Sequence, residues 1–355
     1  MNRKKCRWIA WMVLCGCALA VREGRAERRD SRDPAARLAF VTYVSKPYQE
    51  LAAALWIESI RKWAGEYGRS PIYVVLTDSR VTGIPIPDGE ATKLRIALPE
   101  EARLYPFAVK AFAAARAEEE TAGRVSSLAW FDPETLVFRP PLEMDLPVAT
   151  AAAVNPVHLT NIGQAVEEPV DPFWSAIYRS FGLDPSRLFT VETMVDRRKV
   201  RAWLNCGIFA VRPDRGLLRE WARRMQAGLE DTSFQSTLVA DAPHQTFYHQ
   251  AIFSTLLVSR LARREIHFFS SGNGYPLFCH NTDFKTARGV FQVPAEKKAR
   301  RLDDLTSAFH ESMWYQHEDW RERIPIASES LSRWLSDAFD RTVGSGRSSP
   351  GPGRE

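Results

Sequence analysis

Apolar positions along the chain fall into short continuous runs and longer stretches with helical spacing, and the two kinds alternate. The continuous runs have the length of buried strands, and we expect strands at residues 38–44, 72–77, 93–98, 127–131, 147–154, 204–211 and 265–270. Stretches that are periodic or rich in alanine predict helices at residues 47–64, 105–121, 215–229 and 246–261. Strands that alternate with helices indicate an α/β fold with a largely parallel, right-handed sheet and helices on both faces.

The chain of 355 residues is long enough for two domains, yet its pattern fits one. α/β domains often reach about 250 residues around a single core. We expect one domain over residues 38–340, with a linker before it at 21–37 and a disordered tail after it at 341–355. In open α/β sheets, ligands gather at the carboxyl ends of the strands, which is where functional residues are expected.

Two acidic residues follow the apolar run at 127–131. Asp132 and Glu134 are two residues apart, and Pro133 between them favours extended backbone, in which both side chains point the same way. Two carboxylates that face one way suit a small divalent cation, Mn²⁺ or Mg²⁺, with positions left open for phosphate oxygens. The alternative interpretation is a strand-to-turn junction with solvated acids, since Asp, Pro and Glu are common in turns. In either case the motif ends a strand, so we expect Asp132→Asn to leave the fold intact.

Four segments, taken in order, resemble the GT-A fold glycosyltransferases. They are similar to the first strand, the DxD element, the Asn-Ser-Gly strand and the helical Asp-Gln segment of that family: Leu38–Val44, Phe131–Val137, Leu204–Pro213 and Tyr248–Ile252. Three positions differ from the family pattern, with Glu134 in place of Asp, Cys206 in place of Ser and His249 in place of an acid. The resemblance extends over roughly residues 38–320, and the order of the segments is more specific than any one motif.

The resemblance implies a single GT-A-like domain with a central, mostly parallel mixed sheet flanked by helices. It implies an enzyme that moves a sugar from a nucleotide-diphosphate donor to the hydroxyl of a glycan or other acceptor. The cofactor would be a divalent cation, Mn²⁺ or Mg²⁺, held by Asp132, Glu134 and His310. His310 lacks the family's His-x-x-Gly-x-x-Lys-Pro-Trp context, and His280 is a competing ligand.

The resemblance also assigns binding residues. The donor side comprises Thr42, Tyr43 and Lys110, and the acceptor side comprises Asn205, Gly207, His249 and Gln250. A cation at Lys110 would pair with the diphosphate or orient the carboxylates, whereas the alternative is a solvent-facing helical lysine. The sequence assigns no catalytic base.

The formal net charge of +5 is confined to the N-terminus. Residues 1–30 contain eight Lys or Arg and three Asp or Glu, so the remaining 40 basic and 40 acidic residues balance. A balanced domain has no overall field that would concentrate nucleic acid, and we expect no nucleic-acid partner.

The first 20 residues have the features of a secretory signal. Basic residues precede thirteen mostly apolar ones at 8–20, which end in Ala18-Leu19-Ala20, a typical cleavage site. Thirteen residues are fewer than the ~20 that span a bilayer, so a cleaved signal and a short anchor that associates the protein with a membrane both remain open. We expect an exported or membrane-anchored protein, in the periplasm, outside the cell or in a Golgi lumen. A cytoplasmic protein with a hydrophobic leader is the alternative.

Two cysteines, Cys206 and Cys279, lie beyond this leader, in apolar sequence typical of strands. We expect both to be buried free thiols, with a single disulfide as the alternative.

Two other classes of function fit the acidic pair. One is an exported sugar- or nucleotide-binding protein that keeps the fold without turnover, and the other is a metal-dependent phosphohydrolase or nucleotidyltransferase. The second lacks a Gly-rich phosphate loop with Lys-Ser/Thr. Donor turnover separates the enzyme from the binding protein, and the released product separates the two enzymes.

Overall fold

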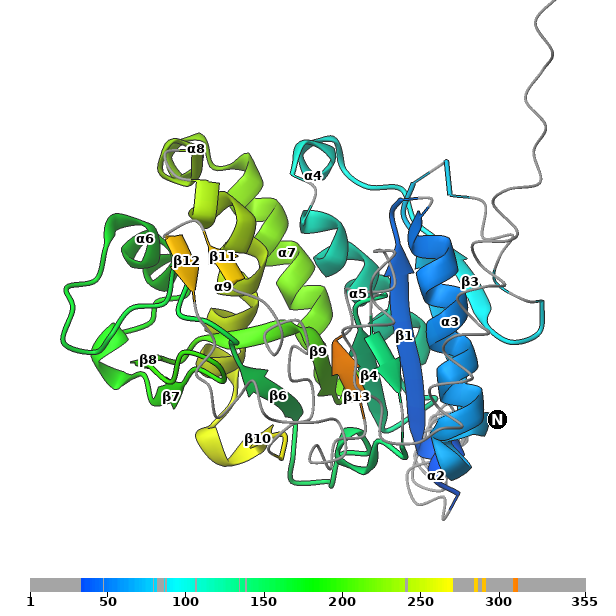
Figure 1. The fold of residues 1–355 in the computed structure, drawn as a ribbon. Helices are drawn as coiled ribbons and strands as arrows, with labels where there is room; N and C mark the ends of the chain where they lie inside the picture. Colours follow the sequence, from blue (N-terminus) through cyan, green and yellow to red (C-terminus); the bar gives the residue numbers. More distant parts are fainter. Residues whose placement is uncertain are drawn as a thin grey trace, which may run out of the picture.

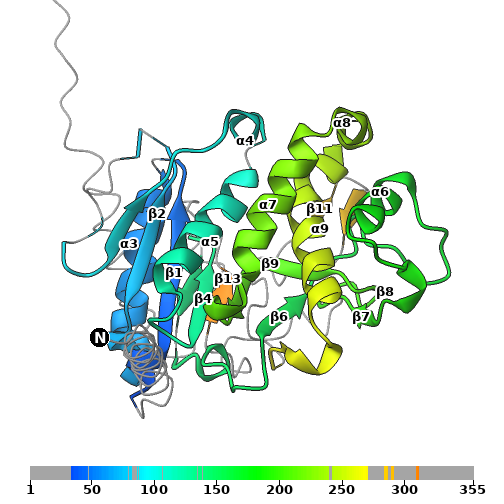
Figure 2. The ribbon, with the colours of Figure 1, turned by 180° about the vertical axis from the view of Figure 1, so that it is seen from behind.

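A computed structural model of the chain describes residues 33–46, 48–78, 80–81, 86, 88–105, 107–133, 135–137, 139–239 and 242–270, together with the strands at 284–286, 289–291 and 309–311. The leader at 1–20, most of the linker, the tail at 341–355, and the residues Glu134, Cys279 and His280 lie outside the described residues. The described part is a central sheet with helices on both faces (Figure 1, Figure 2).

The sheet has seven strands in the order β10-β6-β9-β4-β1-β2-β3. Parallel pairing joins β4 (Ser127–Phe131), β1 (Leu38–Val44), β2 (Ile72–Leu76) and β3 (Thr92–Arg95). Strand β9 (Leu204–Val211) runs antiparallel between β4 and β6 (Ala152–Pro156), and β10 (Ile266–Phe268) pairs parallel with β6. This topology confirms the predicted α/β class with a mostly parallel mixed sheet.

Helices cover the sheet in two layers, one on each face (Figure 1, Figure 2). Helix α3 (Tyr48–Trp63) packs on one face, where Trp56 joins the core formed with Phe40 and Phe131. The other face is covered by α5 (Ala108–Thr121), α7 (Leu217–Glu230) and α9 (Ala242–Arg260). The remaining helical segments are α2 (Pro34–Arg37), η1 (Gly65–Arg69), α4 (Glu100–Leu104), η2 (Leu142–Met144), α6 (Pro172–Ser180), η3 (Pro185–Arg187), η4 (Pro213–Arg215), α8 (Thr232–Val239) and η5 (Arg263–Glu265).

The pleat of the central strands decides which side chains reach the α5 face. In β1, Val41 and Tyr43 pack with the core under α5, whereas Phe40 and Val44 pack on the α3 side. In β4, Trp130 lies on the α5 side. Because side chains two residues apart share a face, a residue two positions after Trp130 is directed toward α5.

Three short antiparallel ladders accompany the main sheet: β7 (Thr190–Glu192) with β8 (Lys199–Arg201), β11 (Phe284–Thr286) with β12 (Gly289–Phe291), and β5 (Thr135–Val137) with β13 (Phe309–Glu311). The last of these sets the backbone of His310 opposite Leu136. A segment from late in the chain therefore pairs beside the acidic motif.

Most predicted elements are confirmed, and two of the differences in their bounds have local causes. The helix predicted at 105–121 begins only at Ala108, as α5, because Tyr105 precedes Pro106 and is extended, with φ −120° and ψ 96°. The strand predicted at 147–154 starts only at Ala152, since the amide of Thr150 closes a turn on the carbonyl of Pro147 at 2.9 Å. Helices α4, α6 and α8 were not predicted.

Candidate active site

Asp132 and Lys110 form a largely buried ion pair at the carboxyl end of β4. The Nζ atom of Lys110, on the sheet-facing side of α5, lies 2.7 Å from Oδ2 of Asp132. Only 8% of the lysine side chain and 15% of the aspartate side chain are exposed. The interpretation of Lys110 as a solvent-facing lysine is therefore wrong, and Asp132 is not a solvated turn residue.

Aromatic residues of the sheet support this pair. Trp130, two residues before Asp132 on the same face, donates its indole N–H to Oδ1 of Asp132 at 3.2 Å. Tyr43 of β1 stacks on Trp130 with ring centroids 5.6 Å apart and an interplanar angle of 15°. The carboxylate is thus held by a donor on each oxygen, which fixes its orientation.

Burial and charge act in opposite directions on the two ionisable groups. Burial acts most strongly and would lower the pKa of Lys110, but Asp132, Cys206 and Tyr43 together outweigh it and raise that pKa, so the lysine is an ammonium ion. Burial raises the pKa of Asp132 above its ordinary value, against the opposing effects of Lys110 and the Trp130 hydrogen bond. The two residues depend on each other to stay charged in this environment.

Strand β9 brings Asn205, Cys206 and Gly207 to the same edge. Its register with β6 shifts between Val154 and Pro156, and this irregularity places both Cys206 and Phe209 in the core on the α5 side. Asn205 Oδ1 accepts from the amide of Gly207 at 2.6 Å, and the carbonyl of Gly207 accepts from the amide of Asp132 at 2.8 Å. The predicted acceptor strand therefore contacts the acidic motif directly.

Cys206 lies between the ion pair and helix α9. Its sulfur is 4.0 Å from Nζ of Lys110 and 3.7 Å from Oε1 of Gln250. Cys206 is buried and forms no disulfide, which agrees with the prediction for this residue. Four predicted or motif residues from α5, β4, β9 and α9 thus meet within one cluster.

His249, next to Gln250 on α9, is buried and neutral. Burial lowers its pKa well below the ordinary value, and the positive charge of Lys110 lowers it further. Its carbonyl accepts from the indole of Trp221 at 2.9 Å, which attaches this part of α9 to α7.

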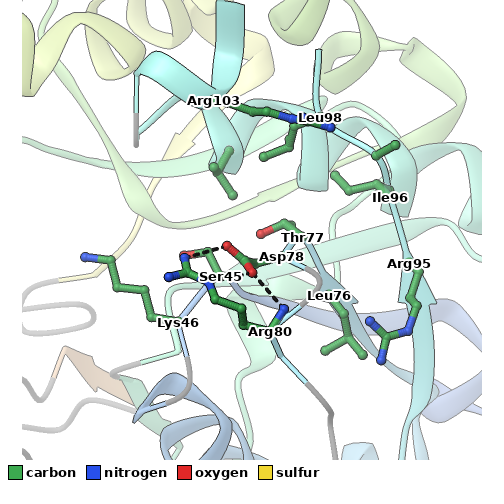
Figure 3. A pocket seen from close by; sticks show the side chains of 12 residues that line it. Ser45, Lys46, Leu76, Thr77, Asp78, Arg80, Arg95, Ile96, Leu98 and Arg103 are labelled. Atoms are coloured by element: carbon green, nitrogen blue, oxygen red, sulfur yellow. Dashed lines mark hydrogen bonds and ion pairs between the residues drawn. The ribbon is translucent and has the colours of Figure 1, made fainter. Parts of the chain in front are cut away.

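A cavity of about 740 Å³ opens at the carboxyl ends of β1, β2 and β3 (Figure 3). Val109, the neighbour of Lys110, lines it, and so do the cationic side chains of Lys46, Arg80, Arg95 and Arg103. The one acid in its lining, Asp78, pairs with Arg80 at 2.7 Å, and this bond lowers the pKa of Asp78 to about 2. Four positive charges against one negative charge make the cavity suited to an anion.

Other predicted residues are placed differently. Thr42 is fully buried, and the strand alternation puts it on the α3 side, away from Lys110. Glu134 lies outside the described residues, and His310 is described only as part of strand β13.

The metal-binding prediction rests on few described side chains. Among the described residues, no group of three or more His, Cys, Asp or Glu side chains could hold a metal ion. Asp132 retains lone pairs beyond its bonds to Lys110 and Trp130. The β5–β13 ladder sets the backbone of His310 opposite Leu136, which follows Glu134 by two positions in the sequence. The residues of the motif are thus compatible with a cation that uses further ligands from Glu134 and His310.

The cavity cations and His158 were missed by sequence reasoning. His158 Nε2 lies 3.5 Å from Nδ2 of Asn205. A signal for the cavity was available, because Thr77, Asp78 and Arg80 come directly after a predicted parallel strand, where ligands gather. No comparable signal marks His158, which comes from the loop after β6.

No protein-family model and no curated protein sequence matches this chain. Solved structures with a similar course of the backbone include the galactosyltransferase LgtC in complex with donor and acceptor sugar analogues. That match has 11% sequence identity and a TM-score of 0.48, and it covers 88% of this chain and 98% of LgtC. An active-site mutant of LgtC matches at 12% identity and a TM-score of 0.46, covering 88% of this chain and 98% of the other. The bifunctional glycosyltransferase WbbM, in its apo form, matches at 11% identity and a TM-score of 0.46, covering 86% of this chain and 52% of WbbM. These structural neighbours are glycosyltransferases.

Proposed function

We propose that this chain is a glycosyltransferase that moves a sugar from a nucleotide-diphosphate donor to an acceptor hydroxyl. The observation that carries the proposal is the positive charge gathered at the carboxyl edge of the sheet. Lys110 lies there as a buried ammonium ion, and its neighbour Val109 lines the cavity that holds four further cations. A diphosphate is the part of such a donor that needs cations at this density.

The chemistry that these residues support is stabilisation of a leaving group. The bond between the sugar's anomeric carbon and the diphosphate oxygen breaks, and the diphosphate leaves with the electron pair. A bond forms between the anomeric carbon and the acceptor oxygen, and the proton of the acceptor hydroxyl passes to solvent water. Lys110 would act on the charge that develops on the diphosphate, and it acts strongly because water is largely excluded around it.

Asp132 has two roles in this proposal. It holds the ammonium of Lys110 in place, and with Glu134 and His310 it would bind a divalent cation, Mn²⁺ or Mg²⁺. When bound, that cation would add positive charge beside the diphosphate. Metal dependence is a prediction that rests on the motif and on the pairing of β13 with β5.

The acceptor would approach from the side of β9 and α9. Asn205 and Gly207 border Asp132 through the Gly207 carbonyl, and Gln250 reaches Cys206 beside Lys110. Amide groups of Asn and Gln both donate and accept hydrogen bonds, as sugar hydroxyls require. His249 belongs to the same side as a neutral imidazole.

Calorimetric titration with a panel of nucleoside diphosphates, with and without Mn²⁺, tests the donor site. Arg103→Gln removes a cavity cation and should weaken binding about tenfold, as expected for loss of one charged hydrogen bond. Arg179→Gln is the matched control, because Arg179 is also an exposed arginine but does not line this cavity. Failure of every nucleoside diphosphate to bind, or equal weakening by both substitutions, would contradict the proposal. Tight binding without any turnover of a nucleotide sugar would instead favour the non-catalytic binding protein.

A further inference from the structure

Phe107 is a large apolar side chain left in solvent beside the candidate active site. It immediately precedes α5, three residues before Lys110, and 42% of it is exposed. The other large apolar side chains that are exposed in the described residues are Leu142, Val148 and Val166. These three side chains are aliphatic, so Phe107 is the aromatic member of this group among the described residues.

One face of the Phe107 ring is already covered. The imidazole of His249 stacks on it with ring centroids 5.2 Å apart and an interplanar angle of 10°. Tyr105 meets the ring edge-on, with centroids 6.2 Å apart. The exposed part of Phe107 is therefore its opposite face and outer edge, held at a fixed angle by two neighbours.

The support beneath Phe107 is aromatic and uncharged. His249 is buried, and because it is neutral, it adds no charge to the stack. The hydroxyl of Tyr105 donates to the carbonyl of Gln245 in α9, which joins the segment before α5 to the start of that helix. A flat ring that two neighbouring rings already contact offers contact area with little loss of conformational freedom when a ligand binds.

A chain of contacts through α9 and β9 relates the Phe107 ring to the Lys110–Asp132 ion pair. His249, beneath it, is adjacent to Gln250, whose Oε1 lies 3.7 Å from the sulfur of Cys206. That sulfur is 4.0 Å from Nζ of Lys110. Phe107 therefore lies on the α9 side of the ion pair, in the segment between Arg103 and Val109, two residues that line the basic cavity.

We propose that Phe107 is a stacking platform for the pyranose ring of the acceptor, and that it selects acceptors with a contiguous C–H face. This inference deepens the glycosyltransferase proposal and rests on it. Pyranose rings present C–H bonds on a face and hydroxyls at the edge. Phe107 would receive the face while Asn205 and Gln250 remain for the edge hydroxyls.

Binding of simple glycosides tests directly whether a pyranose ring stacks on Phe107. Methyl β-galactoside, methyl β-glucoside and methyl α-mannoside are titrated against the protein by saturation-transfer NMR, with nucleoside diphosphate binding measured on the same samples. We expect at least one glycoside to bind the wild-type protein and to receive saturation mainly at protons of one ring face. Phe107→Ala should weaken that binding about tenfold, and Phe107→Trp should restore it.

The controls distinguish loss of stacking on Phe107 from a general effect on folding and from an effect on donor binding. Leu142→Ala removes a different exposed apolar side chain and should leave glycoside binding unchanged. Nucleoside diphosphate affinity should be the same in all three variants. Unchanged glycoside binding in Phe107→Ala, or no binding of any of the three glycosides to the wild type, would overturn the platform. If the wild-type protein binds no nucleoside diphosphate, the proposed function is overturned, whether or not the glycosides bind.

Discussion

The side chains of Lys110 and Asp132 lie at the centre of the candidate site, and they are also a structural liability. Their mutual attraction compensates for burial only while both are present, since a single buried charge without a partner is costly. Sequence reasoning placed Asp132 at a strand end and expected its amide variant to keep the fold intact. The burial of the pair leads to the opposite expectation.

Removing one partner should destabilise the protein strongly. Lys110→Met and Asp132→Asn should each lower the free energy of unfolding by about 3–5 kcal/mol, measured by chemical denaturation. The double variant Lys110→Met/Asp132→Leu should recover part of the loss, because no unpaired charge is left. Lys93→Met is the control, since Lys93 pairs with the fully exposed Asp88, and it should hardly change stability. Single variants as stable as the wild type would show that the pair is not buried as described.

His249 makes the stability of the fold depend on pH. Its pKa in the folded protein is depressed, so below the ordinary value of 6.5 the unfolded chain takes up a proton that the folded protein does not. The contribution of His249 to stability is present above that pH and is lost as the pH falls toward the folded pKa. His249→Phe keeps an aromatic ring against Phe107 and removes this effect.

Denaturation at a series of pH values tests the histidine. As the pH falls from about 6.5 to 5, the free energy of unfolding of the wild type should decrease by up to ~1.4 kcal/mol per pH unit more than that of His249→Phe. Above about pH 7.5 the two proteins should show parallel pH dependence, which serves as the internal control. Parallel curves over the whole range would mean that His249 is accessible and titrates normally.

At the level of elements, the packing of α7 on α9 depends on a glycine inside a helix. A Cβ atom at Gly228 would overlap the hydroxyl oxygen of Tyr248, whose side chain is fully buried. Alanine normally stabilises a helix interior by about 0.5–1 kcal/mol relative to glycine. Here the free-energy cost of the overlap exceeds the gain in helix stability, because neither helix can move without disturbing the core that contains Trp221 and Phe253.

Gly228→Ala should therefore lower the thermal midpoint instead of raising it. Tyr248→Phe removes the overlapping oxygen, and it should cost little alone because that hydroxyl has no hydrogen-bond partner among the described residues. The double variant should be more stable than Gly228→Ala by at least about 1 kcal/mol. A stabilised Gly228→Ala variant would show that the two helices are farther apart than described.

The order of elements was predictable from the sequence, and their tertiary details were less so. Apolar periodicity located β1, β2, β4, β9, α3, α7 and α9, since each buries one or both faces. Helix α6 was missed although Asp171 caps it and Pro172 begins it, because these start signals were not read. The shift in register between β6 and β9, which turns Cys206 toward Lys110, was not predicted, although Gly207 inside β9 is a typical sign of a bulge.

The same limit applies to the site. The acidic motif and Lys110 were found because their residue types and spacing suggest anion or metal chemistry. The cavity arginines come from the loop after β2, from β3 and from α4, segments that only the folded sheet brings together. Thr42 illustrates the converse, because β1 was recognised but its alternation sends that side chain to the α3 face.

At the scale of the whole molecule, the basic residues of the N-terminus and those of the cavity are two separate groups. The basic excess of the sequence is in residues 1–30, outside the described residues, whereas the cations of the cavity belong to the folded part. None of the helices in the described part of the chain has the length and apolar character needed to cross a bilayer.

We propose that residues 1–20 direct the chain across a membrane, on the order of basic, apolar and Ala-x-Ala segments. A reporter fused after Asp30 should be found outside the cytosol in a bacterial or a eukaryotic host. Replacing Leu14 with Arg interrupts the apolar run and should retain the same reporter in the cytosol. Cytosolic retention of the unmodified fusion in both hosts would contradict export.

The most direct test of the proposed function is the product released from a nucleotide sugar. The protein is incubated with a panel of nucleotide-diphosphate sugars and a mixture of glycoside acceptors, and the nucleotide products are separated by chromatography. The glycosyltransferase proposal predicts release of nucleoside diphosphate together with a glycosylated acceptor, and loss of both in Asp132→Asn under conditions where that variant is folded. Release of inorganic phosphate, pyrophosphate or a sugar phosphate in its place, or nucleotide binding without any product, would contradict it.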